Sequence, residues 1–205
     1  MGIQERKQRE RERRRQQIIV AAKRVFSENG FSKSTMEDIA REAELSPGTL
    51  YLYFKNKDEL YASLSLRILQ YLNIRLEDVK KEKGIDARKK VVAIKEALYD
   101  VYQFDPMILI NMFHLQSSET LKNLSSPLLE NITELSRNSL AVLAQIFKED
   151  FGQDKHPNAI ADIVWSLFTG VVLWEESKRM INDNKNFLKQ TLDTAFEIFA
   201  RGVVK

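Results

Sequence analysis

Apolar residues recur at three- and four-residue intervals along most of this 205-residue chain, which is the spacing of one face of a helix. No stretch of about four to eight residues between turn signals alternates cleanly between apolar and polar positions, as a half-buried strand does. Only seven glycines and four prolines interrupt the pattern. The chain is therefore predicted to fold as an all-α protein.

Cap and turn residues divide this pattern into nine expected helices. The first runs from the charged leader to about residue 28 and ends at Asn29-Gly30, because glycine tolerates the backbone that follows a helix. Two short helices follow, at about 35–43 and from Ser46-Pro47 to about residue 54, where hydroxyl side chains can cap the free amides. The other helices are expected at about 56–83, 86–104, 106–117, 127–151, 157–182 and 186–202.

These helices are expected to form two domains. Residues 1–60 would make the first domain, and residues 61–205 the second. The fourth helix would link the two, with Gly84 as the break after it.

Positive charge is concentrated at the start of the chain. Residues 1–15 hold seven bases and three acids, whereas the whole chain has a net charge of only +3. A basic segment on a near-neutral body fits a polyanionic partner, and it fits a solvated helix extension equally well. The charge pattern alone leaves both interpretations open.

Composition excludes several function classes. Without cysteine, the chain has no disulfide, thiolate metal site or thiol nucleophile. Its two histidines, His114 and His156, lie far apart, and neither is followed by a histidine or carboxylate three or four residues later, so no metal site is predicted. No serine-hydrolase or nucleotide-binding glycine motif occurs, so we expect neither a cofactor nor an enzyme.

The sequence also bears on the cellular compartment. The leader is charged where a secretory signal needs an apolar stretch, so a cytoplasmic protein is expected. The longest uncharged apolar run, 163–174, is shorter than the roughly 20 residues that span a bilayer. We interpret that run as a buried helix and expect no membrane contact.

The stretch GFSKSTMEDIAREAELSPGTLYLYFKNKDELY, from Gly30 to Tyr61, fits a helix-turn-helix, in which the second of two short helices lies in a DNA major groove. Leu45, Leu50 and Phe54 can anchor that second helix, which leaves its polar side outward. Hydroxyls and a lysine suit phosphates, and a glycine permits close approach to a base. Packing within the small domain is the alternative role for the tyrosines. The residues expected to contact DNA are Thr35, Ser46, Pro47, Gly48, Thr49, Tyr51, Tyr53 and Lys57.

This stretch resembles the DNA-binding domain of the tetracycline-repressor-like (TetR) family of bacterial regulators over roughly residues 16–62. Two positions depart from the family pattern. Glu44 stands where the family often has glycine, and a left-handed conformation there would cost about 1 kcal/mol. Leu52 replaces an aromatic residue of many members, so one backbone contact with DNA is expected to be missing. The shared features are Gly30-Phe31, Thr35, Ile39-Ala40, Ser46 to Phe54 and Lys57 to Leu60.

The resemblance implies a ligand-responsive transcription regulator, and by analogy a repressor. An effector bound among helices four to eight would tilt the fourth helix, separate the two recognition helices of a homodimer and release a palindromic operator. The apolar character of these helices favours a small lipophilic effector. An effector-independent architectural or division-linked DNA-binding factor is the alternative function. The candidates for effector contact, each of which also fits a helical core, are Tyr102, Asn111, Phe113, His114, Trp165, Phe168 and Thr169.

The last two expected helices are apolar over more than half of their circumference. A helix of this kind needs burial on two sides, and a second subunit can supply one of them. A central core helix within one subunit is the alternative. The residues expected at a dimer interface are Leu167, Gly170, Val171, Trp174, Leu192, Phe196 and Phe199.

Overall fold

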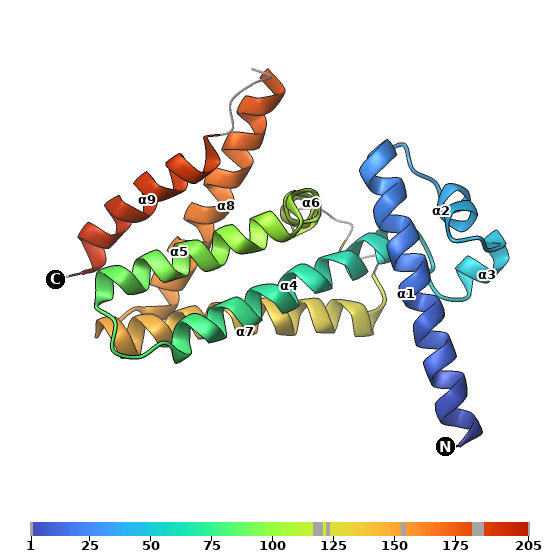
Figure 1. Ribbon diagram of the computed structural model, residues 1–205, viewed down its shortest axis with the longest axis horizontal. Helices are drawn as coiled ribbons and strands as arrows, with labels where there is room; N and C mark the ends of the chain where they lie inside the picture. Colours follow the sequence, from blue (N-terminus) through green and yellow to red (C-terminus); the bar gives the residue numbers. More distant parts are fainter. Residues whose placement is uncertain (1, 117–120, 122–123, 153–154, 182–186, 205) are drawn as a thin grey trace. The chain divides into compact units, whose positions relative to one another are not determined.

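The computed structural model of the protein describes residues 2–116, 121, 124–152, 155–181 and 187–204, without the side chains of residues 111, 114–116 and 180. Within these residues the chain forms nine helices and no strand, which confirms the predicted all-α fold. The helices (Figure 1) are α1 (Ile3–Asn29), α2 (Met36–Glu42), α3 (Pro47–Tyr51), α4 (Lys57–Lys81), α5 (Ala87–Phe104), α6 (Pro106–Gln116), α7 (Ser126–Phe151), α8 (Pro157–Ile181) and α9 (Leu188–Val203).

The chain divides into two compact units. The first unit comprises Met1–Ser65 and Ser118–Leu129, and the second comprises Leu66–Ser117 and Glu130–Lys205. Helix α4 therefore contributes its first nine residues to the first unit and the rest to the second. Gly84, with a positive φ of 79°, lies between two helices of the second unit.

The first unit is built around α1, which packs against α2. One face of α1 is buried from Ile18 to Phe26, and its counterparts on the short helices are Ile39 and Leu50. The N-terminal turns of α1 extend beyond α2 and α3 (Figure 1), and residues 3–13 are exposed throughout. The basic leader is thus a continuous helix, and its outer turns bury nothing.

An aromatic cluster closes this core. Phe26 of α1 and Tyr61 of α4 lie 5.2 Å apart between ring centroids, and Phe31 lies 5.5 Å and 4.9 Å from them. Gly30, directly before Phe31, has a φ of 75°, which a residue with a side chain rarely adopts. The expected helix end at Asn29-Gly30 is therefore confirmed, and it turns Phe31 back onto the core.

A buried carboxylate holds a distant segment in the first unit. Glu59, near the start of α4, accepts hydrogen bonds from the backbone N–H groups of Lys55 (2.9 Å) and Ser125 (3.1 Å). Burial by itself would raise the pKa of the Glu59 carboxyl, but these donors outweigh it and hold the pKa below its usual value. The residues just before α7 are thereby tied to the start of α4.

Buried polar groups join the helices of the second unit. The Asn73 side chain of α4 donates to the Leu135 carbonyl (3.0 Å) and to Ser139 Oγ (2.8 Å) of α7. The fully buried Lys90 of α5 donates to the Val79 carbonyl of α4 (2.8 Å) and lies 3.2 Å from a carboxylate oxygen of Asp150. Because a buried polar group is costly without a partner, these contacts fix which helices pack together.

Helix α9 is held by two further contacts. Asp193 pairs with Lys95 of α5, and Thr191 donates a hydrogen bond of 2.7 Å to the buried carboxylate of Glu175 in α8. Burial alone would raise the pKa of Glu175, but hydrogen bonds from Lys178 and Thr191 lower it overall. Helix α9 is thereby connected to both α5 and α8.

Helix α8 has two apolar faces that differ in their exposure to solvent. Val164, Phe168 and Val172 are buried, whereas Ile163 and Trp174 are largely exposed. The stretch Pro157–Arg179 is long and apolar enough to cross a membrane by length and composition, and only 22% of its most apolar window is buried. The prediction of a buried helix at 163–174 is therefore wrong for one face, because the core of a single chain covers only the other.

Candidate nucleic-acid interface

Helix α2 begins with a reciprocal cap. The Thr35 hydroxyl accepts from the Asp38 N–H (3.1 Å) and donates to the Asp38 carboxylate (2.6 Å), which in turn accepts from the Thr35 N–H. These bonds, led by that from the hydroxyl, lower the pKa of Asp38. The predicted cap by a hydroxyl side chain is confirmed, and Asp38 completes a capping box with it. In this state, the hydroxyl proton of Thr35 is directed at a carboxylate.

The turn between α2 and α3 contains a left-handed residue at the position where the family pattern often has glycine. Glu44 has a φ of 55° and is the one non-glycine residue with positive φ in the described part of the chain. The Gln17 side chain of α1 donates a hydrogen bond of 2.8 Å to the carbonyl of Ala43, directly before it. The turn is therefore fixed to α1, and it tolerates a residue that is less suited to this conformation than glycine.

Helix α3 is capped by Ser46, whose hydroxyl accepts from the Thr49 N–H (3.2 Å) and lies 2.9 Å from the Thr49 hydroxyl. The helix ends at Tyr51, three residues before the predicted end. The reason is a tighter last turn, because the Leu52 and Tyr53 amides bond to carbonyls three residues back. Five residues thus form the recognition helix.

One side of α3 faces the core and the other faces solvent. Leu50 and Phe54 are buried, as predicted, and Leu45 is half-buried. Ser46, Pro47, Gly48 and Tyr51 are exposed, whereas Thr49 and Tyr53 are half-buried. Leu52, where the family pattern often has an aromatic residue, is 77% exposed. The outward side therefore carries hydroxyls, a glycine and one large apolar side chain.

Lys57 occupies a different position from the other candidates. Its ammonium donates to the carbonyls of Phe31 (3.1 Å), Ser32 (3.4 Å) and Ser34 (3.3 Å). The same nitrogen lies 4.7 Å from the centroid of the Phe31 ring. An ammonium has three N–H donors, so these contacts engage all of them and attach the α1–α2 loop to α4.

Sequence reasoning missed the side chains that join distant segments of the first unit. The Arg15 guanidinium lies 4.5 Å from the centroid of the Phe54 ring and donates a hydrogen bond of 3.2 Å to Ser63 Oγ. The bond from the Ser125 amide to Glu59 joins residues 66 positions apart. Neither contact leaves a local signal in the sequence.

The candidate effector residues occupy two parts of the second unit. Phe113 of α6 lies edge-on to Trp165 (5.7 Å between centroids) and Phe168 (6.2 Å) of α8. Thr169 follows on the same helix, and its buried hydroxyl has no hydrogen-bond partner in the described structure. Tyr102 of α5 is buried, which raises the pKa of its hydroxyl. The side chains of Asn111 and His114 lie outside the described residues.

The candidate dimer residues differ in their exposure. Trp174 is 62% exposed, Gly170 is exposed, and Leu167, Val171 and Phe199 are half-buried. Leu192 and Phe196 are buried inside the chain itself, because α9 packs this face against α5 and α8, so they offer no surface to a second subunit. Among the described residues no cluster of histidine and carboxylate side chains suited to a metal ion is found.

Comparison with known proteins gives a consistent result. Residues 18–64 match the family model of bacterial regulatory proteins of the tetR family. The fatty acid metabolism regulator protein of Bacillus subtilis (strain 168) is 26% identical over 188 residues, which covers 91% of this chain and 94% of that protein.

Two solved structures are similar over nearly the whole chain. The transcriptional regulator FadR from Bacillus subtilis in complex with stearoyl-CoA has a TM-score of 0.66 at 25% identity, covering 92% of this chain and 98% of that one. The TetR-family regulator PfmR from Thermus thermophilus has a TM-score of 0.68 at 18% identity, covering 92% and 99%. Because the family match falls on the helix-turn-helix itself and the relatives extend over the rest of the chain, the protein is a DNA-binding transcriptional regulator of the TetR family.

Proposed function

We propose that this regulator is a homodimeric repressor that a long-chain fatty acyl-CoA releases from a near-palindromic operator. The observation that carries the proposal is the full-length similarity to a fatty acid metabolism regulator, together with the solved FadR structure that contains stearoyl-CoA. The acyl-CoA in that structure narrows the predicted class of effector from lipophilic compounds in general to acyl-CoA. It also provides a compound with which the proposal can be tested.

The second unit has suitable chemistry for an acyl chain. The rings of Phe113, Trp165 and Phe168 contact one another across α6 and α8, which places a continuous aromatic surface inside this unit. Thr169 adds a buried hydroxyl with no partner among the described residues. Ligand sites commonly combine an apolar wall with a few such polar groups. We assign Thr169 to an effector contact.

We assign DNA contacts to the outward side of the helix-turn-helix. Tyr51 and Tyr53 would bond phosphates through their hydroxyls, and Ser46 and Thr49 would do so by exchanging the contact of 2.9 Å between their own hydroxyls. Pro47 and Gly48 allow close approach of the backbone. Thr35 and Lys57 already have partners, so either must exchange a bond to reach a phosphate. We therefore propose that Lys57 supports the interface mainly by holding the α1–α2 loop.

Two single substitutions distinguish a residue that contacts DNA from a residue that stabilises the structure of the interface. Tyr51→Phe should weaken binding to operator and unrelated duplexes alike by about ten- to hundredfold, with an unchanged melting temperature, because each protomer of the dimer loses one exposed hydroxyl. Lys57→Met should lower the free energy of unfolding by about 1–3 kcal/mol, because three carbonyls lose a charged donor. Fluorescence anisotropy and thermal unfolding measure the two effects. Unaltered DNA affinity in the first variant, or unaltered stability in the second, contradicts the assignment.

The exposed face of α8 supports a homodimer. Ile163, Leu167, Gly170, Val171 and Trp174 share one face at helical spacing, and this face adjoins the buried one. Two of these side chains, Ile163 and Trp174, expose more than half of their surface. A second copy of the same face would cover them symmetrically. A twofold dimer would place two recognition helices on half-sites spaced by about one helical turn or a multiple of it.

The dimer can be tested by placing charge on this face. The unmodified chain should sediment as a dimer at micromolar concentration, and Trp174→Glu should sediment as a folded monomer with weakened operator binding. Ile74→Glu, which charges an exposed apolar position on α4, is the matched control and should remain dimeric. A folded wild-type monomer, or a Trp174→Glu dimer, refutes the proposed interface.

Thermal unfolding tests the effector. Stearoyl-CoA at about 100 times its dissociation constant should stabilise the protein by about 2.7 kcal/mol, and CoA alone should not. Thr169→Val should reduce this ligand effect without destabilising the free protein, because its hydroxyl has no partner in the described structure. Thr194→Val, which removes an exposed hydroxyl bonded to the Gln190 carbonyl, is the control. No stabilisation by any acyl-CoA chain length favours the effector-independent DNA-binding factor instead.

A further inference from the structure

The outer turns of α1 carry their charges in an ordered way. At about 100° per residue, Lys7, Arg11 and Arg15 lie along one side of the helix, each four residues from the next. Gln4 and Gln8 accompany them on that side, and no acid does. The bases Arg6 and Arg13 lie toward the other side of the helix.

Arg15 establishes which side this is. Its guanidinium lies over the Phe54 ring, 4.5 Å from the centroid, and bonds to Ser63 of α4. Phe54 follows directly after the recognition helix and its last turn. Lys7 and Arg11 therefore lie on the side of α1 that faces the end of the recognition segment. They lie beyond the part of α1 that packs on the core.

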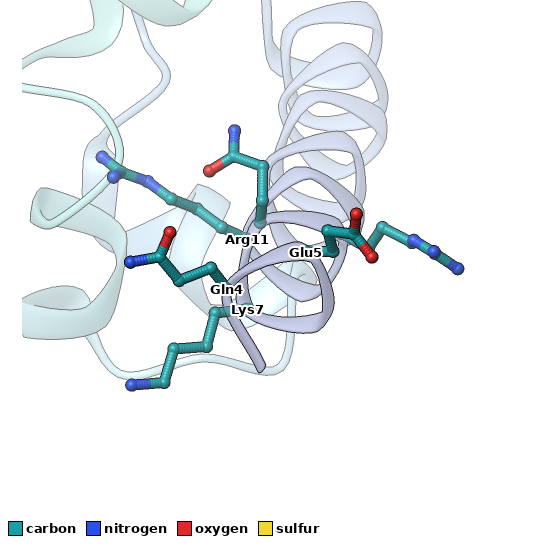
Figure 2. Close-up of a pocket in the computed structure, with 6 residues that line it drawn as sticks. Gln4, Glu5, Lys7 and Arg11 are labelled. Carbon is teal, nitrogen blue, oxygen red and sulfur yellow. The ribbon is translucent and has the colours of Figure 1, made fainter. Parts of the chain in front are cut away.

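Two acidic residues of this helix segment are bonded to groups other than Lys7 and Arg11. Glu10 forms ion pairs with Arg13 (3.1 Å) and Arg14 (3.8 Å), and Glu5 accepts from the Gly2 N–H. Figure 2 shows Gln4, Lys7 and Arg11 pointing to one side of α1 and Glu5 to the other. Neither Lys7 nor Arg11 has an ion-pair partner within the described structure, so both positive charges are available to a partner.

We propose that Lys7 and Arg11, called here the leader pair, bind phosphates of the duplex beside the half-site that the helix-turn-helix occupies. The inference rests on the proposed DNA contacts of the first unit and extends that interface along α1. Successive residues four apart rise by about 6 Å along a helix, so the pair can reach separate phosphates. Long cationic side chains on an outer helix face contact the backbone without reading bases.

The composition of this helix segment favours DNA over a lipid surface. A helix that lies on a membrane needs an apolar face beside its basic one. Residues 3–15 contain one large apolar side chain, Ile3, and glutamines accompany the leader pair. A duplex, which carries one negative charge for each roughly 1.7 Å of its axis, matches a purely polar basic side.

The salt dependence of DNA binding tests the leader pair. Lys7→Gln/Arg11→Gln is compared with Arg6→Gln/Arg13→Gln, which removes the same charge from the same turns on the other side. Because the proposed homodimer carries this pair twice, the slope of log K against log salt should fall by about 3.6 in the first variant, and affinity at 0.15 M salt should fall by about 1000-fold. Operator and unrelated duplexes should be affected alike, and circular dichroism should show the same helix content in all proteins.

The outcomes distinguish this inference from the proposed function. A slope reduction that exceeds that of the control by about one or more supports the leader pair. Equal slopes in the two variants, whether reduced or unchanged, overturn it, while operator binding by the wild type still stands. If the wild-type protein shows no operator preference at all, the proposed function itself fails.

Discussion

The first turn of α4 holds together two loops that the sequence separates widely, and the rest of the first unit depends on it. Lys57 donates to three carbonyls of the α1–α2 loop, and Glu59 accepts from the amides of Lys55 and Ser125. Two opposite charges, two residues apart, thereby fix the loop before the helix-turn-helix and the segment before α7. Because charged hydrogen bonds at partly buried sites are strong, this turn is expected to resist independent movement of either segment.

This arrangement suggests how a signal could reach the DNA-binding residues. The segment held by Glu59 continues directly into α7, and α4 itself runs from the first unit into the second. A ligand that changes the second unit would therefore act on the first turn of α4 along two covalent paths. For this to release DNA, the ligand must bind better to the form that does not hold the operator.

Local chemistry explains why much of the fold could be predicted from the sequence. Thr35 with Asp38, Ser46 with Pro47, and Asn29 with Gly30 are short-range signals, so helix ends and the helix-turn-helix followed from neighbouring residues. Contacts between residues that are far apart in the sequence left no such signal. The roles of Lys57, Glu59 and Arg15 depend on tertiary packing, as does the burial of Phe196 inside the chain. Periodicity alone indicates that a helix face is apolar, but it cannot distinguish a neighbouring helix from a second subunit.

The proposed function requires that binding of an acyl-CoA affect the residues that bind the operator, and the first turn of α4 lies where the two covalent paths meet. The most direct test of this coupling is the dissociation constant of stearoyl-CoA with and without saturating operator duplex, in the wild type and in Glu59→Gln. In the wild type, operator should weaken stearoyl-CoA binding by the same factor by which stearoyl-CoA weakens operator binding, typically about 5- to 150-fold. In the folded Glu59→Gln variant this factor should fall toward one. A wild-type factor of one, or an undiminished factor in the variant, would contradict the account.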